Sequence, residues 1–252
     1  MEFRRIFDTI PEEFDRYRTR YCPELFRDLI AAANVGPGAD VLELGPGTGQ
    51  ATEPVLRTGC AYHAIELGEH LAAKLREKYG GEPNFHLVND DFITHDFGLQ
   101  RFDLIYSAAT IQWIPEEIAF FKTFSLLRPG GTLAMLLTRS DYRTPNEALY
   151  QEIQKVYDAY FKPETPYPHS SFRYENAVQY GFTHFERSEY QTTRTLTADE
   201  YAAYCGTHCD HLVIPEPFQS RFFDGLRQAV LDAGNRIGFL DTHVLYLARK
   251  PG

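Results

Sequence analysis

The sequence predicts an α/β fold with a mostly parallel sheet. Apolar, β-favouring runs alternate with helical segments across residues 39–138 and give five β-α repeats. A glycine cluster follows the first run, and a Pro-Gly-Gly turn precedes the fifth. A hydrophobic fraction of 43% in 252 residues is ample for the core of one large domain, alone or with a cap.

The first apolar run ends at Leu44 and leads directly into Gly45, Gly47 and Gly49. Glycine allows positive φ and has no Cβ, so the backbone of this strand–loop–helix junction can press against a ligand. A dinucleotide fingerprint needs a glycine three residues after its second one, and that position holds Gln50. A P-loop needs Gly-Lys-Ser/Thr, which is absent. The loop therefore predicts a ligand contact without a pyrophosphate cradle.

The second run, residues 61–67, ends in an acid. Glu66 follows Gly45 by about 20 residues, the separation at which a βαβ unit places a carboxylate on a ribose. A carboxylate can accept hydrogen bonds from both ribose hydroxyls. Glu66 therefore predicts a nucleoside cofactor.

The remaining elements follow from hydrophobic periodicity and turn residues. Thr197 to Glu200 has the residue order of a capping box at a helix start. Pro163, Pro166 and Pro168 predict a loop that belongs to a cap. Helices are expected from Pro11 and Pro23 and over 50–58, 68–79, 145–161 and 216–233, and further strands over 84–88, 102–109, 132–137, 182–194 and 242–249.

Several segments resemble one family. Glu43-x-Gly-x-Gly-x-Gly resembles motif I of the class I S-adenosylmethionine (SAM) methyltransferases. The segments "FDLIYSAATIQWIPE" and "LRPGGTLAM" are similar to those of trans-aconitate methyltransferase-like enzymes, a bacterial small-molecule branch. "FDRYRTRYCP" resembles the lid motif of that branch, from which Thr19 and Cys22 depart, and "TLTADEYAAYCGTHCDHLVIPE" is also similar.

The resemblance implies a Rossmann-like, seven-stranded sheet that is mostly parallel with an antiparallel last strand. Helices cover both faces, and a helical cap insert is added. Residues 1–35 would form N-terminal lid helices, 36–140 the SAM-binding core and 141–181 a helical and loop substrate cap. Residues 182–252 would supply terminal strands with a helical insert (195–235) over the pocket mouth and complete the same domain.

The resemblance also implies SAM as the cofactor and S-adenosylhomocysteine as the product. Glu66 would bind the ribose and Asp91 the adenine amino group, with the backbone N–H of Phe92 near a ring nitrogen. The implied cofactor-binding residues are Tyr17, Arg18, Glu43, Gly45, Pro46, Gly47, Thr48, Gly49, Glu66, Leu67, Asp91, Phe92, Ser107 and Ala108. The hypothesised substrate pocket consists of Tyr21, Gln112, Trp113, Arg139 and His211.

The expected reaction is an in-line displacement at the sulfonium methyl, in which the protein mainly aligns the two reactants. No residue stands out as a catalytic base, and a carboxylate acceptor would need none. A nucleic-acid acceptor is disfavoured by the net charge of −10 and by Ser107-Ala-Ala-Thr110, which stands where amino-methylating enzymes carry Asn/Asp-Pro-Pro-Tyr/Phe. A small-molecule acceptor is expected. The alternatives are a SAM-binding protein without turnover and an NAD-dependent oxidoreductase.

Partners and location are predicted from what the sequence lacks. No apolar run approaches the ~20 residues of a membrane span, and the N-terminus lacks an apolar signal segment. A cytoplasmic monomer or homodimer with no membrane partner is expected. Four cysteines are too few for a disulfide framework and are expected to be reduced. Cys205, His208, Cys209 and His211 could ligate zinc, but no second cysteine pair exists, so no metal is expected.

Overall fold

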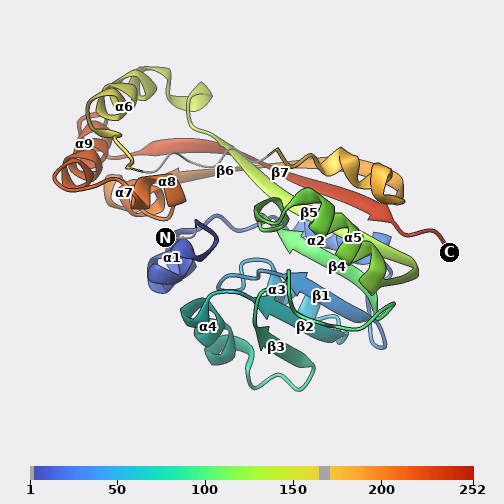
Figure 1. Cartoon of the computed structure of the whole chain (residues 1–252). Coiled ribbons are helices and arrows are strands. Elements are labelled where there is room, and N and C mark those ends of the chain that lie inside the picture. The colour runs from blue at the N-terminus through green and yellow to red at the C-terminus, as the bar shows by residue number, and fades with distance from the viewer. Residues whose placement is uncertain (1–2, 165–170) are drawn as a thin grey trace. The chain divides into compact units, whose positions relative to one another are not determined.

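The computed structural model describes residues 3–164 and 171–252. Figure 1 shows the chain with its elements labelled. The strands are β1 (Asp40–Leu44), β2 (Ala61–Glu66), β3 (Phe85–Asn89), β4 (Phe102–Ala108), β5 (Leu127–Asp141), β6 (Thr183–Leu196) and β7 (Ile237–Arg249). The α-helices are α1 (Pro11–Tyr17), α2 (Pro23–Ala32), α3 (Thr52–Leu56), α4 (Glu69–Tyr79), α5 (Glu116–Leu126), α6 (Glu147–Tyr160), α7 (Ala198–Cys205), α8 (Cys209–Leu212) and α9 (Phe218–Asp232). Short 3₁₀ helices are η1 (Phe3–Thr9), η2 (Ile111–Trp113), η3 (Thr144–Asn146) and η4 (Tyr174–Tyr180).

The seven strands form one sheet in the order β3-β2-β1-β4-β5-β7-β6. β3, β2, β1, β4 and β5 are parallel neighbours, and the last strands are antiparallel (Figure 1). This arrangement confirms the class I methyltransferase fold expected from the sequence. The chain turns back across the sheet after β3, so β1 and β4 lie side by side at the point where ligands bind in open α/β sheets.

The register of the central strands brings three loops to one edge. Leu44 of β1 pairs with Ile65 of β2 on one side and with Ser107 of β4 on the other. All three strands are parallel, so their carboxyl ends lie at the same edge. The glycine loop, the segment after Glu66 and the segment after Ala108 therefore begin together.

Each face of the sheet is covered by its own apolar cluster. One cluster joins Val41 and Leu104 of the sheet to Leu25 of α2, Val55 of α3 and Leu75 of α4. The other joins strand residues of the opposite face to residues of α5 and η4, including Leu42, Ile105, Phe120 and Ala177. A strand buried on both faces reads as a continuous apolar run, which is why β1 and β4 were predicted correctly.

The connection from β3 to β4 contains no helix, so the expectation of five β-α repeats was wrong at this point. Residues 90–101 form turns and irregular backbone instead. Asp90, Asp91 and Asp96 bind nearby backbone N–H groups or a histidine, which competes with helix formation. Phe92 and Phe97 fill the space on that face with aromatic rings.

Two strands are longer than expected. β5 begins at Leu127 rather than residue 132, and it includes the Pro-Gly-Gly segment. Phe102 pairs with Leu127 and Leu104 with Thr132, so the turn lies within an irregularity of the ladder rather than before the strand. β7 begins at Ile237 rather than residue 242 because a run of alternating buried positions extends the ladder backwards. The part of the predicted cap loop that contains Pro166 and Pro168 lies outside the described residues.

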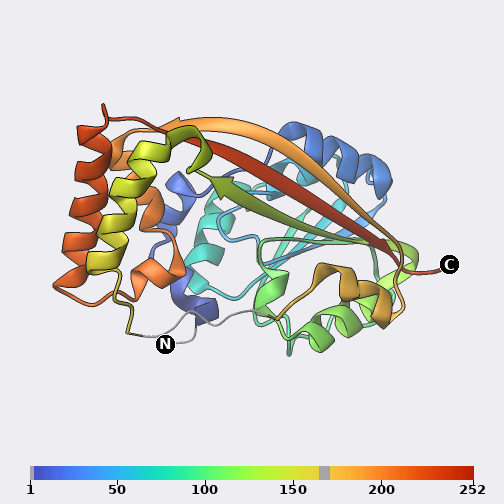
Figure 2. The same cartoon turned by 90° about the horizontal axis from the view of Figure 1, so that it is seen from above.

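Contacts divide the chain into two compact units. Within the described residues, one unit contains 19–138, 171–190 and 243–252, and the other contains 3–18, 139–164 and 191–242. The second unit has an apolar core of its own built from α6, α7 and α9, with Ile153, Tyr201, Phe222 and Leu226 fully or almost fully buried. α6 and α9 run side by side in both views (Figure 2). α2, expected with the lid, packs with the sheet instead.

Across residues 3–164 and 171–252, no helix combines the length and the apolar character that crossing a bilayer requires.

The capping box predicted at α7 is present. The Thr197 hydroxyl accepts a hydrogen bond from the Glu200 backbone N–H at 3.4 Å, and the Glu200 carboxylate accepts one from the Thr197 backbone N–H at 2.9 Å. We expect Thr197→Ala to lower the free energy of unfolding by about 1 kcal/mol because it leaves a helix N–H without its side-chain acceptor. Denaturant unfolding measures this loss. The matched control is Thr193→Ala, at an exposed threonine of β6, and an equal loss in both variants would contradict the cap's role.

Candidate functional site

The glycine loop has the backbone conformation that its sequence predicts. Gly45, Gly47 and Gly49 have φ values of 60°, 63° and 92°, which favour glycine. A Cβ on Gly45 would lie 2.3 Å from Cγ2 of Thr110, so that residue must be glycine while Thr110 stays in place. The Gly45 N–H donates to the Ile65 carbonyl at 2.9 Å and continues the ladder into the loop.

Glu66 binds the glycine loop directly. Its Oε2 accepts a hydrogen bond from the Gly47 N–H at 2.9 Å, and its Oε1 accepts one from the Gly68 N–H at 2.9 Å. The residue is only 5% exposed. A carboxylate oxygen can accept more than one hydrogen bond, so a carboxylate that binds backbone N–H groups can also bind a ribose hydroxyl. The acid at the end of β2 therefore joins the loop after β1 to the segment after β2.

Side chains also hold the middle of the loop. The Gln50 amide donates to the Thr48 hydroxyl at 2.7 Å and accepts from the Thr48 N–H at 3.1 Å. Lys78 of α4 donates to the Thr48 carbonyl at 2.7 Å. Pro46, Thr48 and Gly49 are buried. The position where a dinucleotide fingerprint has glycine is thus occupied by a side chain folded onto the loop.

The segment after β3 presents Asp91 beside Phe92. Asp91 Oδ1 accepts from the Ile93 N–H at 2.9 Å, and its carbonyl accepts from the N–H groups of Thr94 and His95. Phe92 is 6% exposed, and the Lys122 ammonium lies 5.0 Å from the centre of its ring. Asp91 is half-buried. Its hydrogen bond to Ile93 fixes one carboxylate oxygen in a turn at the edge of the sheet. Asp90 is exposed and binds His95.

The end of β4 and the segment after it brace the glycine loop through hydroxyl groups. Ser107 is fully buried; its hydroxyl accepts from the Ile111 N–H at 2.9 Å and donates to the Leu44 carbonyl at 3.4 Å. The Thr110 hydroxyl donates to the Gly45 carbonyl at 2.9 Å. Ala108 is half-buried, and Ala109 has a φ of 57°, an uncommon value for a residue other than glycine.

Gln112 and Trp113 lie in η2, directly after this segment. The Gln112 amide donates to the Ala109 carbonyl at 3.0 Å, and its oxygen accepts from the Tyr174 hydroxyl at 3.4 Å. The Trp113 N–H of the backbone donates to the Thr110 carbonyl at 2.9 Å. Both side chains are half-buried. They lie in the same unit as the glycine loop.

The other predicted residues are divided between the units. Tyr21 belongs to the unit with the glycine loop and packs against Phe26 and His243. Tyr17, Arg18, Arg139 and His211 belong to the other unit. Arg18 lies over the rings of Phe7 and Phe14 and donates to the Thr207 carbonyl at 3.4 Å, whereas Arg139 is exposed. That these residues form one lid and one pocket with the loop stays a prediction.

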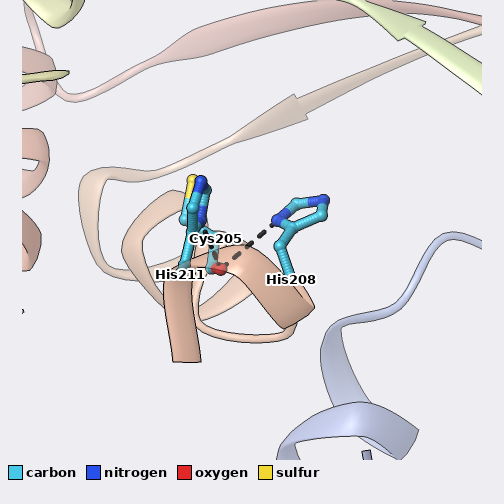
Figure 3. Close-up of side chains that lie close together, drawn as sticks. All are labelled: Cys205, His208 and His211. Atoms are coloured by element: carbon cyan, nitrogen blue, oxygen red, sulfur yellow. Dashed lines mark hydrogen bonds between the residues drawn. The ribbon is translucent and has the colours of Figure 1, made fainter. Parts of the chain in front are cut away.

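His211 belongs to a cluster that includes Cys205 and His208. One potential ligand atom from each of the three lies within 4.8 Å of the others. Figure 3 shows both imidazole rings bonded to the carbonyl oxygen of Cys205, through His211 Nδ1 at 2.8 Å and His208 Nδ1 at 3.3 Å. His211 Nε2 lies 3.1 Å from the Tyr157 hydroxyl.

This cluster is built for hydrogen bonds within the protein. A cysteine binds zinc as a thiolate, and burial raises the pKa of Cys205 to about 12. Burial lowers the pKa of both histidines, which favours neutral rings. One nitrogen of each ring binds the Cys205 carbonyl. The absence of a metal stays a prediction.

A groove of about 510 Å³ lies between residues 94–99 and α5. Phe121 and Leu99, which are 61% and 76% exposed, are among its lining residues. None of the residues predicted for cofactor or substrate lines it.

Sequence reasoning missed the partners of Glu43. Thr52, Tyr62 and Tyr106 surround its carboxyl group, and all four side chains are fully buried. Tyrosine at an interior position of a parallel strand is the signal that could have found them, because a buried hydroxyl needs a polar partner. Lys78 gave no comparable signal, since it lies on a helix with several charged residues.

Comparison with known families matches residues 41–131 to the family described as "Methyltransferase domain". Ribosomal RNA small subunit methyltransferase A of Parasynechococcus marenigrum (strain WH8102) is 36% identical over 126 residues, which cover 50% of this chain and 37% of that protein. Malonyl-acyl-carrier-protein O-methyltransferase 1 of Ilyobacter polytropus is 30% identical over 98 residues, which cover 38% of this chain and 36% of that protein. In both cases the chain spans little more than a third of the relative's own length.

Solved structures are similar over most of the chain at low identity. A structure described as a type II methyltransferase of Anaeromyxobacter dehalogenans has a TM-score of 0.66 and 18% identity, and the match covers 94% of this chain and 100% of that one. Phosphoethanolamine N-methyltransferase 2 of Haemonchus contortus, in complex with S-adenosylhomocysteine, has a TM-score of 0.59 and 15% identity, covering 100% of this chain and 61% of that one. These findings agree with the expected cofactor, and they leave the small-molecule branch open. The chain therefore has the class I SAM-dependent methyltransferase fold, with a methyltransferase domain matched at its glycine loop.

Proposed function

We propose that this protein is a SAM-dependent methyltransferase that moves a methyl group to a small-molecule acceptor. The observation that carries the proposal is the bridge from Glu66 to the N–H groups of Gly47 and Gly68. Through these hydrogen bonds, a carboxylate and a glycine backbone lie side by side at the carboxyl ends of β1 and β2. A nucleoside with a charged tail could contact both at this edge of the sheet. The family match over residues 41–131 supports it.

An NAD-dependent oxidoreductase is the weaker alternative. A dinucleotide's pyrophosphate must approach the helix N-terminus closely, which is why its fingerprint has a third glycine. Here Gln50 folds onto Thr48, and α3 is only five residues long. Thr48, Lys78 and Gln50 thus support a loop that holds the methionine and ribose parts of SAM.

The residues of the site have distinct roles in this proposal. Gly45, Gly47 and Gly49 would admit the cofactor to the backbone, Glu66 would hold the ribose, and Asp91 would accept from the adenine amine. SAM supplies a methyl group already activated by the sulfonium charge. The protein would then align the acceptor at about 3–3.5 Å and exclude water. Gln112 and Trp113, beside the loop in the same unit, are the pocket residues best supported by the fold. Tyr17, Arg18, Tyr21, Arg139 and His211 remain proposed members.

A small acceptor is supported by the surface charge and by the segment after β4. The net charge of −10 opposes binding to a polyanion. Ser107 and Thr110 are engaged with Ile111, Leu44 and Gly45, so neither hydroxyl stands ready to orient a base. A small carboxylic acid is the acceptor class we favour, because a carboxylate acceptor needs no catalytic base. The cytoplasmic location and the monomeric or homodimeric state stay predictions.

Methyl transfer to RNA is the second candidate. It is favoured by one observation, the ribosomal RNA methyltransferases at 36% to 40% identity over segments of the chain. These matches cover 37% and 22% of the two relatives' lengths.

Substitution in the loop tests the cofactor site. Gly47→Ala adds a Cβ beside the backbone N–H that Glu66 binds, and we expect SAM affinity to fall at least tenfold, equivalent to about 1.4 kcal/mol. Calorimetry with SAM measures it. Gly130→Ala is the matched control, because its φ of 80° imposes comparable strain at a position with open space around it. Equal, undiminished SAM affinity in both variants would contradict the assignment of the loop.

The acceptor class is tested with SAM carrying a labelled methyl group. We expect label to appear in a pool of small organic acids and not in purified ribosomal RNA, because the acidic surface repels RNA. Chromatography of the two fractions measures the outcome, and Gly47→Ala, with SAM held below its dissociation constant, serves as the control with reduced transfer. Label in RNA would replace the proposed acceptor by the second candidate, and SAM binding with no label in either fraction would indicate a binding protein.

A further inference from the structure

Glu43 is a fully buried acid in the unit that holds the glycine loop. It lies on β1 two residues before Gly45, and its side chain has no exposed surface. Its Oε2 accepts from the Thr52 hydroxyl at 2.6 Å and contacts the Tyr62 hydroxyl. Within the part of the chain that the structure describes, its Oε1 has no hydrogen-bond partner. Because this side chain has no exposed surface, it can affect a ligand through its charge or through the residues that it binds, and not by direct contact from solvent.

A chain of oxygen atoms leads from Glu43 to the end of the glycine loop. The Tyr62 hydroxyl contacts the Tyr106 hydroxyl, and the Tyr106 hydroxyl lies 3.2 Å from the Ala51 carbonyl. Thr52, the next residue, donates to Glu43. The loop leaves β1 after Leu44 and enters α3 at Thr52, so this network joins its two ends.

Counting protons along this chain indicates the state of the carboxyl group. Three contacts need one proton each: Glu43 with Tyr62, Tyr62 with Tyr106, and Tyr106 with the Ala51 carbonyl. The two phenols supply two protons. A protonated Glu43 supplies the third by donating to Tyr62, and every contact is then satisfied. With an ionised Glu43, Tyr62 must donate to the carboxylate and Tyr106 to Tyr62, so Tyr106 no longer donates to the Ala51 carbonyl. That carbonyl keeps the backbone N–H that an N-cap residue receives, but the carboxylate then carries a buried charge with hydroxyl donors alone on Oε2 and, among the described residues, no partner on Oε1.

The charges around Glu43 agree with this count. The groups that act on it are neutral: Thr52 from α3, Tyr62 from β2 and Tyr106 from β4. The helices on this face contribute apolar residues to the same cluster. Burial, opposed by these three hydrogen bonds, raises the pKa of Glu43 to about 7. The charged side chains bound to the loop itself are Glu66 and Lys78.

We infer that Glu43 distinguishes the charged cofactor from its neutral product, by holding a proton in the free protein and releasing it when a sulfonium ion occupies the loop. This inference rests on the proposed function. SAM carries one more positive charge than S-adenosylhomocysteine, and a positive charge near a buried carboxyl group favours its ionised form. The released proton goes to solvent, and the carboxylate then attracts the sulfonium. The product lacks that charge and leaves Glu43 protonated.

The preference for SAM over S-adenosylhomocysteine is expected to increase with pH. Below the pKa that Glu43 has in the SAM complex, Glu43 is protonated with either ligand, so the preference for SAM is smallest. As pH rises toward about 7, the SAM complex ionises first and the preference grows. Above that range Glu43 is ionised in every state and the preference is constant. A difference of about one pKa unit between the two complexes corresponds to a tenfold change.

The test measures the ratio of the dissociation constants for S-adenosylhomocysteine and SAM by calorimetry between about pH 5.5 and 8.5. The sulfonium charge lowers the pKa of the amino group of SAM below that of S-adenosylhomocysteine, so the ligands' own titration contributes to the ratio and is read from Glu43→Gln. We expect the ratio to rise about tenfold more in the wild type than in Glu43→Gln. Glu69→Gln, at an exposed acid of α4 in the same unit, is the matched control and should keep the wild-type rise.

A second variant keeps the inference testable if Glu43→Gln does not fold. Tyr62→Phe removes a hydrogen bond that lowers the pKa of Glu43, so the rise should move to higher pH. Infrared difference spectra of the wild type should also lose a protonated carboxyl band on SAM binding and keep it with S-adenosylhomocysteine. A ratio whose pH dependence in the wild type is the same as in Glu43→Gln or Tyr62→Phe overturns this inference alone. Failure to bind either ligand overturns the proposed function and the inference with it.

Discussion

The carboxylate of Glu66 is the constraint on which the rest of the site depends. It binds two backbone N–H groups from segments that follow different strands, Gly47 after β1 and Gly68 after β2. Strand register alone would bring these segments to one edge of the sheet without fixing their separation. A buried carboxylate with two charge-assisted hydrogen bonds fixes that separation, because moving either segment would break one of them. The loop is therefore shaped before any ligand arrives.

A second carboxyl group acts on the same loop from within the core. Glu43 and its tyrosines connect the start of the loop to Thr52 and Ala51, while Ser107 and Thr110 bind Leu44 and Gly45 from the segment after β4. The loop is thus bound at both ends and in the middle, by one network at the edge of the sheet and by another within the core. The two carboxyl groups differ in setting: Glu66 faces N–H donors, whereas Glu43 faces hydroxyl groups that can reverse their direction of donation.

Much of the sheet could be predicted because the signals for its strands and for the glycine loop lie within short stretches of sequence. β1 and β4 are buried on both faces and read as apolar runs, and the positive φ values at Gly45, Gly47 and Gly49 are a conformation that glycine spacing signals directly. The missing helix after β3 and the early start of β5 were not predictable in this way.

Asp90 and Asp91 form turns through their own side chains, so no helix follows β3. The Pro-Gly-Gly segment lies in an irregularity of the β4–β5 ladder, which can be recognised only once the partner strand is known. The network of Glu43 depends on residues from three strands and a helix, a juxtaposition that spacing does not encode. The lid and acceptor residues stay predictions because Tyr17, Arg18, Arg139 and His211 lie in a different unit from the loop.

The division into two units has a consequence for how acceptor specificity can diverge in proteins of this kind. Neither unit is one continuous segment, and β5, β6 and β7 each cross from one unit to the other. The family match, residues 41–131, lies wholly in the unit that contains the glycine loop. The other unit, with its own core around Ile153 and Phe222, can therefore change its side chains without disturbing the matched domain. It cannot be exchanged as a block by a single recombination event, because three strand junctions would have to be joined in register at once. Gradual substitution of residues on the shared scaffold is the route by which a new acceptor would be acquired.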